Sequence, residues 1–598
     1  MDITEQNKKR HSLAHLLAAA VLKIYPDTLL TIGPAIENGF YYDFEFSSPV
    51  SEKDLDSIEK EMKKLLPDWK SFEKIEVSPE EAREIFRDNE YKLELIDEIE
   101  KKGEQVTLYY SGEKNSVPEK SDILKAESYK LKAGFLDLCR GGHVENPAKE
   151  IEPDSFKLDR IAGAYWRGDE NNKMLTRIYG LAYDTEEELD QFLAKREEMA
   201  KRDHRKIGKE LGLFTFSDLV GAGLPLFTPK GTALRQALFD RLLKISKRYD
   251  MQPVTIPHMA KKKLYEISGH AEKFGDELLI VKSHYGEFIL KPVNCPHHTQ
   301  IYAGEPRSYR DLPLRFMEST MQYRDEQPGE IGGLTRTRGF TVDDGHIFCR
   351  IDQVDQEAKN IAEIIKEFYG AIGLWGNHWV SLSVRDPENL QKYIGNENDW
   401  KEAEKMLQKV SDDLGLNAKR QEGEAALYGP KLDFMFKDAL GRERQLSTIQ
   451  IDFAMPKRFE LEYTDKDGTK KTPVMIHRAI LGSYERFMAI LIEHFAGAFP
   501  FWLSSIQVKV LPVNEKHLEY AENIFQKLKD NNFRVEIDRS DENLGKKVRQ
   551  AKVEKVPYFL VIGDKEIESG GITIESREAE KETLKLEDLI YFLNEKNN

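Results

Sequence analysis

MQYRDEQPGEIGGLTRTRGFTVDDGHIFC, residues 321–349, joins apolar residues that favour strands to three arginines, two adjacent aspartates and a histidine. Proline and glycine within 328–333 predict a turn, so the stretch is expected to form a long hairpin. After the turn, alternate residues of an unbroken strand share one face, and these include Arg336, Asp344 and His346. Such charges are rarely buried without partners, which favours a ligand-binding face. A solvent-exposed charged hairpin is the alternative.

Composition describes a folded globular protein without an export signal. Apolar residues make up 40% of the 598 residues and charged residues 32%. No run reaches the roughly 20 apolar residues that a membrane span needs. The first residues lack the apolar core of a secretory signal, and three cysteines without CxxC spacing fit a reducing compartment. We therefore expect a cytoplasmic protein that does not associate with membranes.

The net charge of −16 does not exclude a nucleic-acid partner, because phosphate contacts need only a local basic patch. Residues 195–209 are one candidate, although the acids in this run could equally form ion pairs along a helix. The length predicts about four domains. We expect an α/β multidomain chain divided as follows: residues 1–184, a first domain; 185–209, a helical linker; 210–502, a mixed α/β domain on a large sheet; 503–598, a small domain with a mainly parallel sheet.

The first block contains a possible metal-binding or hydrolytic cluster. His11 and His15 are spaced i, i+4 in a predicted helix, which places both imidazoles on one face. Cys139 and His143 follow much later in DLCRGGH. These four residues could form a tetrahedral zinc site or a metal-free hydrolytic pocket, or they could be unrelated.

The central block contains three further potential zinc ligands, Cys295, His346 and His477. One thiolate and two imidazoles would leave a fourth position open for substrate, but their wide spacing by itself favours a buried cysteine with two satisfied histidines. Arg486 lies in an apolar run that predicts a core helix. Its guanidinium requires an anion, which could be Glu485, Glu493 or the phosphate of a ligand.

Longer motifs resemble the three signatures of class II aminoacyl-tRNA synthetases: GLPLFTPKGTALRQALFD at 223–240, YRDE at 323–326 with TRTRGF, and GSYERF at 482–487. NCPHH, TRTRGFTVDDGHIFC, EGEAALYGPKLDF, QLSTIQIDF and PVMIHRAILGSYERF together resemble the threonyl-tRNA synthetase family. The resemblance continues through HSLAH, DLCRGGH and VPYFLVIGDKE and spans nearly the whole chain.

The resemblance implies a class II catalytic core with a mixed, mainly antiparallel sheet, an N-terminal α+β editing domain and a C-terminal α/β anticodon-binding domain. It implies a homodimer that uses ATP to attach L-threonine to the 3′ end of tRNA(Thr) through a threonyl-adenylate. It also implies hydrolytic editing of seryl-tRNA(Thr). The chain begins almost at His11, so we expect the family's N-terminal ubiquitin-like TGS domain to be absent.

The same resemblance assigns roles in the central block. Cys295, His346 and His477 would hold one zinc ion per subunit that binds the threonine amino and hydroxyl groups. The remaining expected residues are these: Asp344 and Tyr428 at the amino acid; Arg324 with Glu326 at the α-phosphate of ATP, which brings Mg²⁺; Arg486 at the γ-phosphate; Lys431 near the phosphates; His270 at the terminal ribose; and Arg336, Gln445, Thr448 and Gln450 at nucleotide or amino acid.

Serine also carries the hydroxyl, and one missing methyl gives only about 1–3 kcal/mol of discrimination, so a second site is expected. The resemblance places it in the first block and implies that it works without metal, in preference to the zinc interpretation. Its expected residues are His11, His15, Lys92, Asp137, Cys139 and His143. Two departures concern its geometry: Gly142 stands where proline is common, and residues 112–134 form a longer stretch than usual.

Overall fold

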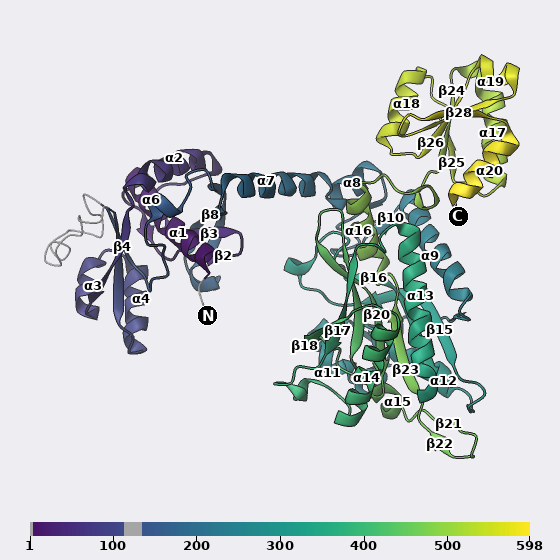
Figure 1. Cartoon of the computed structure of the whole chain (residues 1–598), viewed down its shortest axis with the longest axis horizontal. Coiled ribbons are helices and arrows are strands. Elements are labelled where there is room, and N and C mark those ends of the chain that lie inside the picture. The colour runs from purple at the N-terminus through teal and green to yellow at the C-terminus, as the bar shows by residue number, and fades with distance from the viewer. Residues whose placement is uncertain (1–3, 113–133, 598) are drawn as a thin grey trace. The chain divides into compact units, whose positions relative to one another are not determined.

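A computed structural model describes residues 4–112 and 134–597 (Figure 1). The longer stretch expected at 112–134 therefore lies almost entirely outside the described residues. The chain divides into two compact units, Met1–Glu197 and Glu198–Asn598. No helix in the described ranges is long and apolar enough to cross a membrane.

Unit 1 packs helix α1 (Glu5–Ile24) on an antiparallel sheet with the strand order β1-β3-β8-β7, and β2 pairs with β3. Thr4 caps the start of α1 by accepting from the backbone N–H of Asn7. A second antiparallel sheet has the order β4-β5-β6. The other elements are β1 (Leu29–Leu30), β2 (Ala35–Ile36), β3 (Gly39–Glu45), α2 (Leu55–Leu65), β4 (Ser71–Val77), α3 (Pro79–Ile85), α4 (Glu90–Lys101), β5 (Val106–Gly112), β6 (Phe135–Leu138), α6 (Pro147–Glu150), β7 (Phe156–Tyr165) and β8 (Met174–Ala182).

The helical run expected at 185–209 is interrupted. Helix α7 (Glu186–Lys201) ends before Arg202, and α8 (His204–Glu210) starts after Asp203, whose carboxylate accepts from the backbone N–H of Arg205. Asp203 is therefore an N-cap that begins a new helix.

Unit 2 is built on an eight-stranded sheet with the order β11-β15-β16-β23-β20-β19-β17-β18. Only the outer pairs β11–β15 and β17–β18 are parallel, so the predicted mainly antiparallel core is confirmed. The predicted hairpin is also confirmed: β15 (Leu314–Tyr323) pairs with β16 (Gly339–Cys349) without a register shift. Its other strands are β11 (Gln252–Pro253), β17 (His378–Val384), β18 (Lys419–Glu422), β19 (Lys431–Lys437), β20 (Glu443–Asp452) and β23 (Val474–Ala479).

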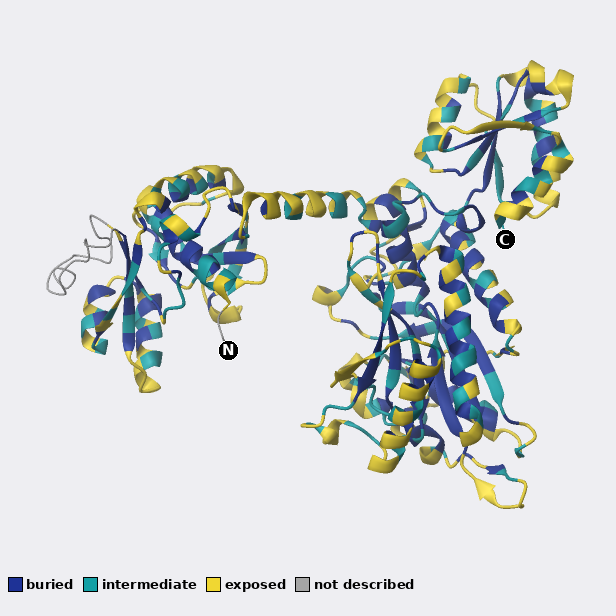
Figure 2. Ribbon diagram, in the orientation of Figure 1, coloured by how far each residue is buried: buried dark blue, intermediate teal, exposed yellow. Residues whose placement is uncertain are grey.

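Helices α9 (Pro229–Lys247), α13 (Val354–Ile372) and α16 (Tyr484–Phe495) contribute apolar side chains to the largest core of unit 2. Figure 2 shows mainly buried residues in the strands and exposed residues on the outer helix faces. The remaining elements of residues 214–471 are β9 (Phe214–Thr215), β10 (Leu226–Phe227), β12 (Met259–Lys261), α10 (Lys262–Ser268), α11 (His270–Phe274), β13 (Ile280–Ser283), β14 (Gly286–Leu290), α12 (Cys295–Ala303), α14 (Glu397–Asp413), α15 (Ala454–Arg458), β21 (Tyr463–Thr464) and β22 (Lys470–Lys471).

The C-terminal sheet has the order β25-β24-β26-β27-β28. The pairs of β24 with β25 and β26 are parallel, whereas β27 and β28 are antiparallel, so the expectation of a mainly parallel sheet was wrong. The connection between β26 and β27 is shorter than a parallel crossover requires, so β27 pairs antiparallel to β26. The elements are β24 (Val508–Pro512), α17 (Leu518–Asp530), β25 (Val535–Ile537), α18 (Leu544–Val553), β26 (Tyr558–Ile562), α19 (Asp564–Ser569), β27 (Ile572–Ser576), β28 (Lys581–Leu584) and α20 (Leu586–Asn597).

Candidate functional site

Three soft or imidazole donors converge where α12 meets the middle of the large sheet. Cys295 begins α12, while His346 on β16 and His477 on β23 are direct cross-strand partners. All three are buried, and one donor atom from each lies within 4.8 Å of the others. The structure therefore brings together the three ligands that were proposed from widely separated motifs.

The outer nitrogens of both imidazoles are already engaged. His346 Nδ1 lies 2.7 Å from His298 Nδ1, and His477 Nε2 lies 2.8 Å from a carboxylate oxygen of Asp452. The inner nitrogens, His346 Nε2 and His477 Nδ1, are 3.1 Å apart. Burial raises the pKa of the Cys295 thiol, and a bound cation would hold it as thiolate. This donor set with its outer partners fits zinc.

Polar groups for a small ligand surround this centre. Asp344 lies two residues before His346 on the same face of β16, accepts from the Asn294 amide at 3.1 Å, and has its pKa raised by burial. The Tyr428 ring centroid is 4.8 Å from that of His477. Gln450, the cross-strand partner of His477, donates to the carbonyl of Gly429 at 3.1 Å.

His270 reaches the same centre from α11. Its Nε2 lies 4.0 Å from Cys295 Sγ, and its Nδ1 lies 2.9 Å from the hydroxyl of Ser268. Burial lowers the pKa of His270 to about 3, so the imidazole is neutral at neutral pH. It offers a hydrogen-bonding group without a positive charge.

Asp433 on β19 holds three of the expected residues and was not identified from the sequence. Its carboxylate accepts from Lys431 Nζ at 2.5 Å, the Gln445 amide at 2.7 Å and the Thr448 hydroxyl at 2.8 Å. The signal was the alternation of KLDF, which puts Lys431 and Asp433 on one face. Asp433 therefore organises this edge of the site.

Arg324 follows directly after β15 and lies between two aromatic rings. Its guanidinium is 4.9 Å from the Phe274 centroid and 5.3 Å from that of Phe340. Its Nε is buried and has no hydrogen-bond partner among the described residues. Glu326 is instead bound by Arg336, whose Nε donates to it at 2.7 Å. Arg324 is thus fixed in orientation and available to an anion.

Arg486 lies in the first turn of α16 with an exposed side chain, and no hydrogen bond or ion pair of its guanidinium is found within residues 4–112 and 134–597. The two structural carboxylates considered for it are occupied elsewhere. Glu485 accepts from the backbone N–H of Thr341 at 2.7 Å, and Glu493 faces His204 at 2.7 Å. That alternative was wrong: Glu485, the preceding residue, points to another face of the helix, and Glu493 lies seven residues, about two turns, further along it.

Unit 1 brings its four predicted donors together. His11 Nε2 lies 3.2 Å from His15 Nε2 and 3.5 Å from Cys139 Sγ, and His143 Nε2 lies 3.3 Å from the same sulfur. Burial lowers the pKa of His11 and His143, takes that of His15 well below its usual range, and raises that of Cys139 to about 12. Neutral imidazoles and a neutral thiol line this pocket.

Lys92 and Asp137 lie against the same cluster. Lys92 Nζ is 2.5 Å from one oxygen of Asp137, and the other oxygen accepts from the Tyr42 hydroxyl at 2.7 Å and lies 3.5 Å from His15 Nδ1. Gly142 has φ +91°, which proline cannot adopt. The loop of this chain therefore differs from one that carries proline at that place.

Comparisons with known proteins agree with this arrangement. The family model described as the tRNA synthetase class II core domain (G, H, P, S and T) matches residues 279–495, and the anticodon binding domain matches residues 507–596. A threonine–tRNA ligase from Gloeobacter violaceus is 47% identical and is aligned over 100% of this chain and 93% of its own length. The threonine–tRNA ligase of Cytophaga hutchinsonii is 46% identical, and the alignment covers 98% of this chain and 88% of that protein.

Solved structures are also similar. The structure described as the RNA binding domain of threonyl-tRNA synthetase from Cryptosporidium parvum has a TM-score of 0.63 at 36% identity, over 66% of this chain and 98% of its own. A putative threonyl-tRNA synthetase from Aeropyrum pernix has a TM-score of 0.60 at 30% identity, and the match covers 66% of this chain and 95% of that structure. The full-length identity and the class II core together establish that this chain belongs to the threonine–tRNA ligase family of class II aminoacyl-tRNA synthetases.

Proposed function

We propose that this chain uses ATP to attach L-threonine to the 3′ end of tRNA(Thr) through a threonyl-adenylate, and that it hydrolyses seryl-tRNA(Thr) at a second site. The observation that carries the first part is the convergence of Cys295, His346 and His477 beside Asp344. We assign residues 1–184 to editing, 185–209 to a linker, 210–502 to catalysis and 503–598 to anticodon binding. We also propose a cytoplasmic homodimer.

The amino-acid pocket selects for a hydroxyl group. Cys295, His346 and His477 would hold zinc, which supplies a Lewis acid for the amino and hydroxyl groups of threonine. Asp344 is placed to accept a hydrogen bond from that hydroxyl, and Tyr428 to contact the amino acid. Valine matches the shape of threonine but leaves these polar groups unpaired, so the pocket rejects it.

Two arginines, for which the described part of the chain gives no carboxylate ion pair, are placed to address the phosphates of ATP. Arg324, held between two rings, would meet the α-phosphate, and Arg486 the γ-phosphate, with Mg²⁺ bound to the nucleotide. The threonine carboxylate attacks the α-phosphorus, the bond to the bridging oxygen breaks, and pyrophosphate leaves. Positioning and charge stabilisation supply the catalysis, because no covalent protein intermediate is needed. Neutral His270 would then contact the terminal ribose of tRNA.

The editing pocket clears serine that the first site admits. His11, His15, Cys139 and His143 supply neutral hydrogen-bonding groups that can orient a water molecule, and Asp137 and Lys92 hold His15 from behind. We propose a metal-free hydrolysis. Replacing His11 and His15 with alanine is expected to leave threonylation intact and to let seryl-tRNA accumulate, whereas unchanged hydrolysis would refute this assignment.

Amino-acid-dependent pyrophosphate exchange with threonine, serine and valine tests the synthetic reaction. We expect exchange with threonine, exchange about 10–200-fold weaker with serine, and none above background with valine. Cys295→Ala should lose both bound zinc and exchange. Tight tRNA binding without any exchange would replace this proposal with that of an RNA-binding protein.

A further inference from the structure

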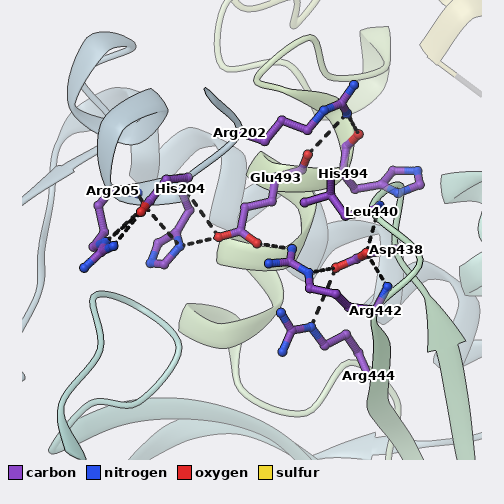
Figure 3. Close-up of polar contacts among 10 residues, drawn as sticks. Arg202, His204, Arg205, Asp438, Leu440, Arg442, Arg444, Glu493 and His494 are labelled. Carbon is purple, nitrogen blue, oxygen red and sulfur yellow. Dashed lines mark hydrogen bonds and ion pairs between the residues drawn. The ribbon is translucent and has the colours of Figure 1, made fainter. Parts of the chain in front are cut away.

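His204 joins the loop after β15 to the helix that carries Arg486. It is the first residue of α8 and is 5% exposed. Its Nδ1 lies 2.7 Å from a carboxylate oxygen of Glu493 on α16, and its Nε2 accepts from the backbone N–H of Leu334 at 3.1 Å. Figure 3 shows the imidazole facing Glu493. A single side chain therefore bridges two elements that are far apart in the sequence.

The two contacts determine the state of the ring. The N–H of Leu334 can only donate, so His204 Nε2 carries the lone pair and the proton is on Nδ1, which donates to Glu493. Asp203, His204 and Glu493 have spacing that could hold a metal ion, but neither nitrogen of His204 is free to ligate one. The group is a hydrogen-bonded bridge.

On the loop side, the contact with His204 depends on Gly333 and on the buried residue that follows it, Leu334. A Cβ at Gly333, which has φ +55°, would lie 2.4 Å from His204 Nε2. The Leu334 side chain is 1% exposed in the core, so its N–H would lose its partner without His204. The small size of Gly333 and the hydrogen bond of Leu334 therefore allow the loop to lie against the His204 ring.

The helix end of the bridge continues into the turn between β19 and β20. Glu493 also accepts from Arg442, and Arg442 Nε donates to Asp438 at 2.7 Å in the turn between β19 and β20. Burial opposes the ionisation of Glu493, but the hydrogen bonds from His204 and Arg442 outweigh it and lower its pKa. Arg444 Nε lies 3.7 Å from the same Asp438 carboxylate, and its positive charge acts, after burial, to lower the pKa of Arg486. Figure 3 shows Glu493, Arg442, Asp438 and Arg444 with the contacts between them.

We infer that His204 is a positioning residue for ATP. It fixes residues 328–338 against α16. The first of these segments contains Arg336, and the first turn of α16 contains Arg486. The inference rests on the proposed function, because it concerns the nucleotide of that reaction. Threonine is held instead by side chains of β16, β23 and α12. Loss of the bridge should therefore weaken ATP use and leave threonine use nearly unchanged.

Two amide substitutions separate the halves of the bridge in the full chain. Asn at 204 can keep the donor to Glu493 but not the acceptor for Leu334, while Gln can keep that acceptor but not the donor. We expect His204→Asn, which leaves the buried N–H of Leu334 unpaired, to raise the KM for ATP about tenfold, and His204→Gln, which leaves Glu493 its contact with Arg442, to raise it less. The KM for threonine should change less than about twofold.

Gly333→Ala tests the same contact from the loop side, with Gly329→Ala as the matched control, because a Cβ at Gly329 meets nothing within 4 Å. We expect the first variant to raise the KM for ATP like His204→Asn and the second to match the wild type, even if a His204 variant folds poorly. Unchanged ATP constants, or equal changes for ATP and threonine, would overturn the inference. A wild-type chain without exchange would instead refute the proposed function.

Discussion

At the scale of single residues, the two imidazoles of the central site are oriented by groups behind them. Asp452 accepts from His477 Nε2 at 2.8 Å and also from the backbone N–H groups of Ala454 and Met455 at 2.7 and 2.8 Å. Both oxygens of the carboxylate are thus engaged. This fixes the proton of His477 on Nε2 and leaves Nδ1 to face His346.

Asp452→Asn is therefore expected to weaken zinc binding about 10–100-fold, because one amide cannot accept from both the ring and the backbone. Competition with a chromophoric zinc chelator measures the affinity without relying on enzyme activity. Asp467→Asn, in the exposed turn between β21 and β22, is the matched control and should bind zinc like the wild type. Equal affinity of the two variants would show that Asp452 does not orient His477.

The editing pocket leads to a prediction about pH. Burial lowers the pKa of His11 and takes that of His15 well below its usual range, since it disfavours the charged form. As the pH falls, both rings should stay neutral past about pH 6.5, where an ordinary imidazole gains half a charge. Hydrolysis of preformed seryl-tRNA should therefore fall off only at a pH lower than that at which an ordinary imidazole titrates, about pH 6.5. A decline with its midpoint near pH 6.5 would contradict this.

Some residues of the candidate sites could be identified from the sequence, and others could not. Arg486 could be chosen because an arginine in an apolar run lacks an obvious partner, and Arg324 because it stands in the charged hairpin and the YRDE motif. Asp433 had only one local signal, its alternation with Lys431, and His204 had none, because their other partners are more than ten positions away and only the fold brings them near. A polar residue in a strand or at a helix start has many ordinary explanations.

At the scale of elements, β16 is the strand that carries both Asp344 and His346, and its central glycine is confined. A Cβ at Gly345 would lie 2.8 Å from the carbonyl oxygen of Phe316 on β15 and 2.5 Å from Arg478 Nε. Arg478 is fully buried and paired with Asp343 at 2.7 Å. Neither neighbour can move easily, because one is backbone and the other is held in a buried ion pair.

Gly345→Ala should cost about 1–3 kcal/mol of stability through overpacking. It should reduce threonine-dependent exchange about a hundredfold if β16 shifts by about 1 Å, because the neighbouring site residues shift with it. Thermal unfolding and exchange kinetics measure the two effects. Gly370→Ala in α13 is the control, since a Cβ there meets nothing within 4 Å. Wild-type behaviour of Gly345→Ala would show that the strand has room to adjust.

The elements themselves were more predictable than their pairing. The turn residues within 328–333 and the alternation after them predicted the hairpin, because both signals are local. The mainly parallel sheet expected at the C-terminus was wrong in two of its four strand pairs, because the direction of β27 depends on a connection whose geometry the sequence pattern does not specify.

At the scale of the whole molecule, the residues proposed for synthesis and those proposed for editing fall in separate compact units. All central-site residues lie within Glu198–Asn598, and all editing residues within Met1–Glu197. The order of motifs predicted this division, because each site draws its residues from one continuous stretch of chain. Fine boundaries were less predictable: the expected linker contains a break at Asp203, where a new helix starts that contributes His204 to the catalytic unit.

A chain limited to residues 198–598 should therefore activate threonine, reject valine and form seryl-tRNA that it cannot hydrolyse. The reason is chemical: the central site selects for a hydroxyl, serine has one, and the missing methyl is worth only about 1–3 kcal/mol. Charging of tRNA with labelled threonine and serine measures both outcomes, and the full-length His11→Ala/His15→Ala variant is the matched comparison. The two proteins should accumulate seryl-tRNA alike. If the shortened chain still cleared seryl-tRNA, the editing site would have to lie within residues 198–598.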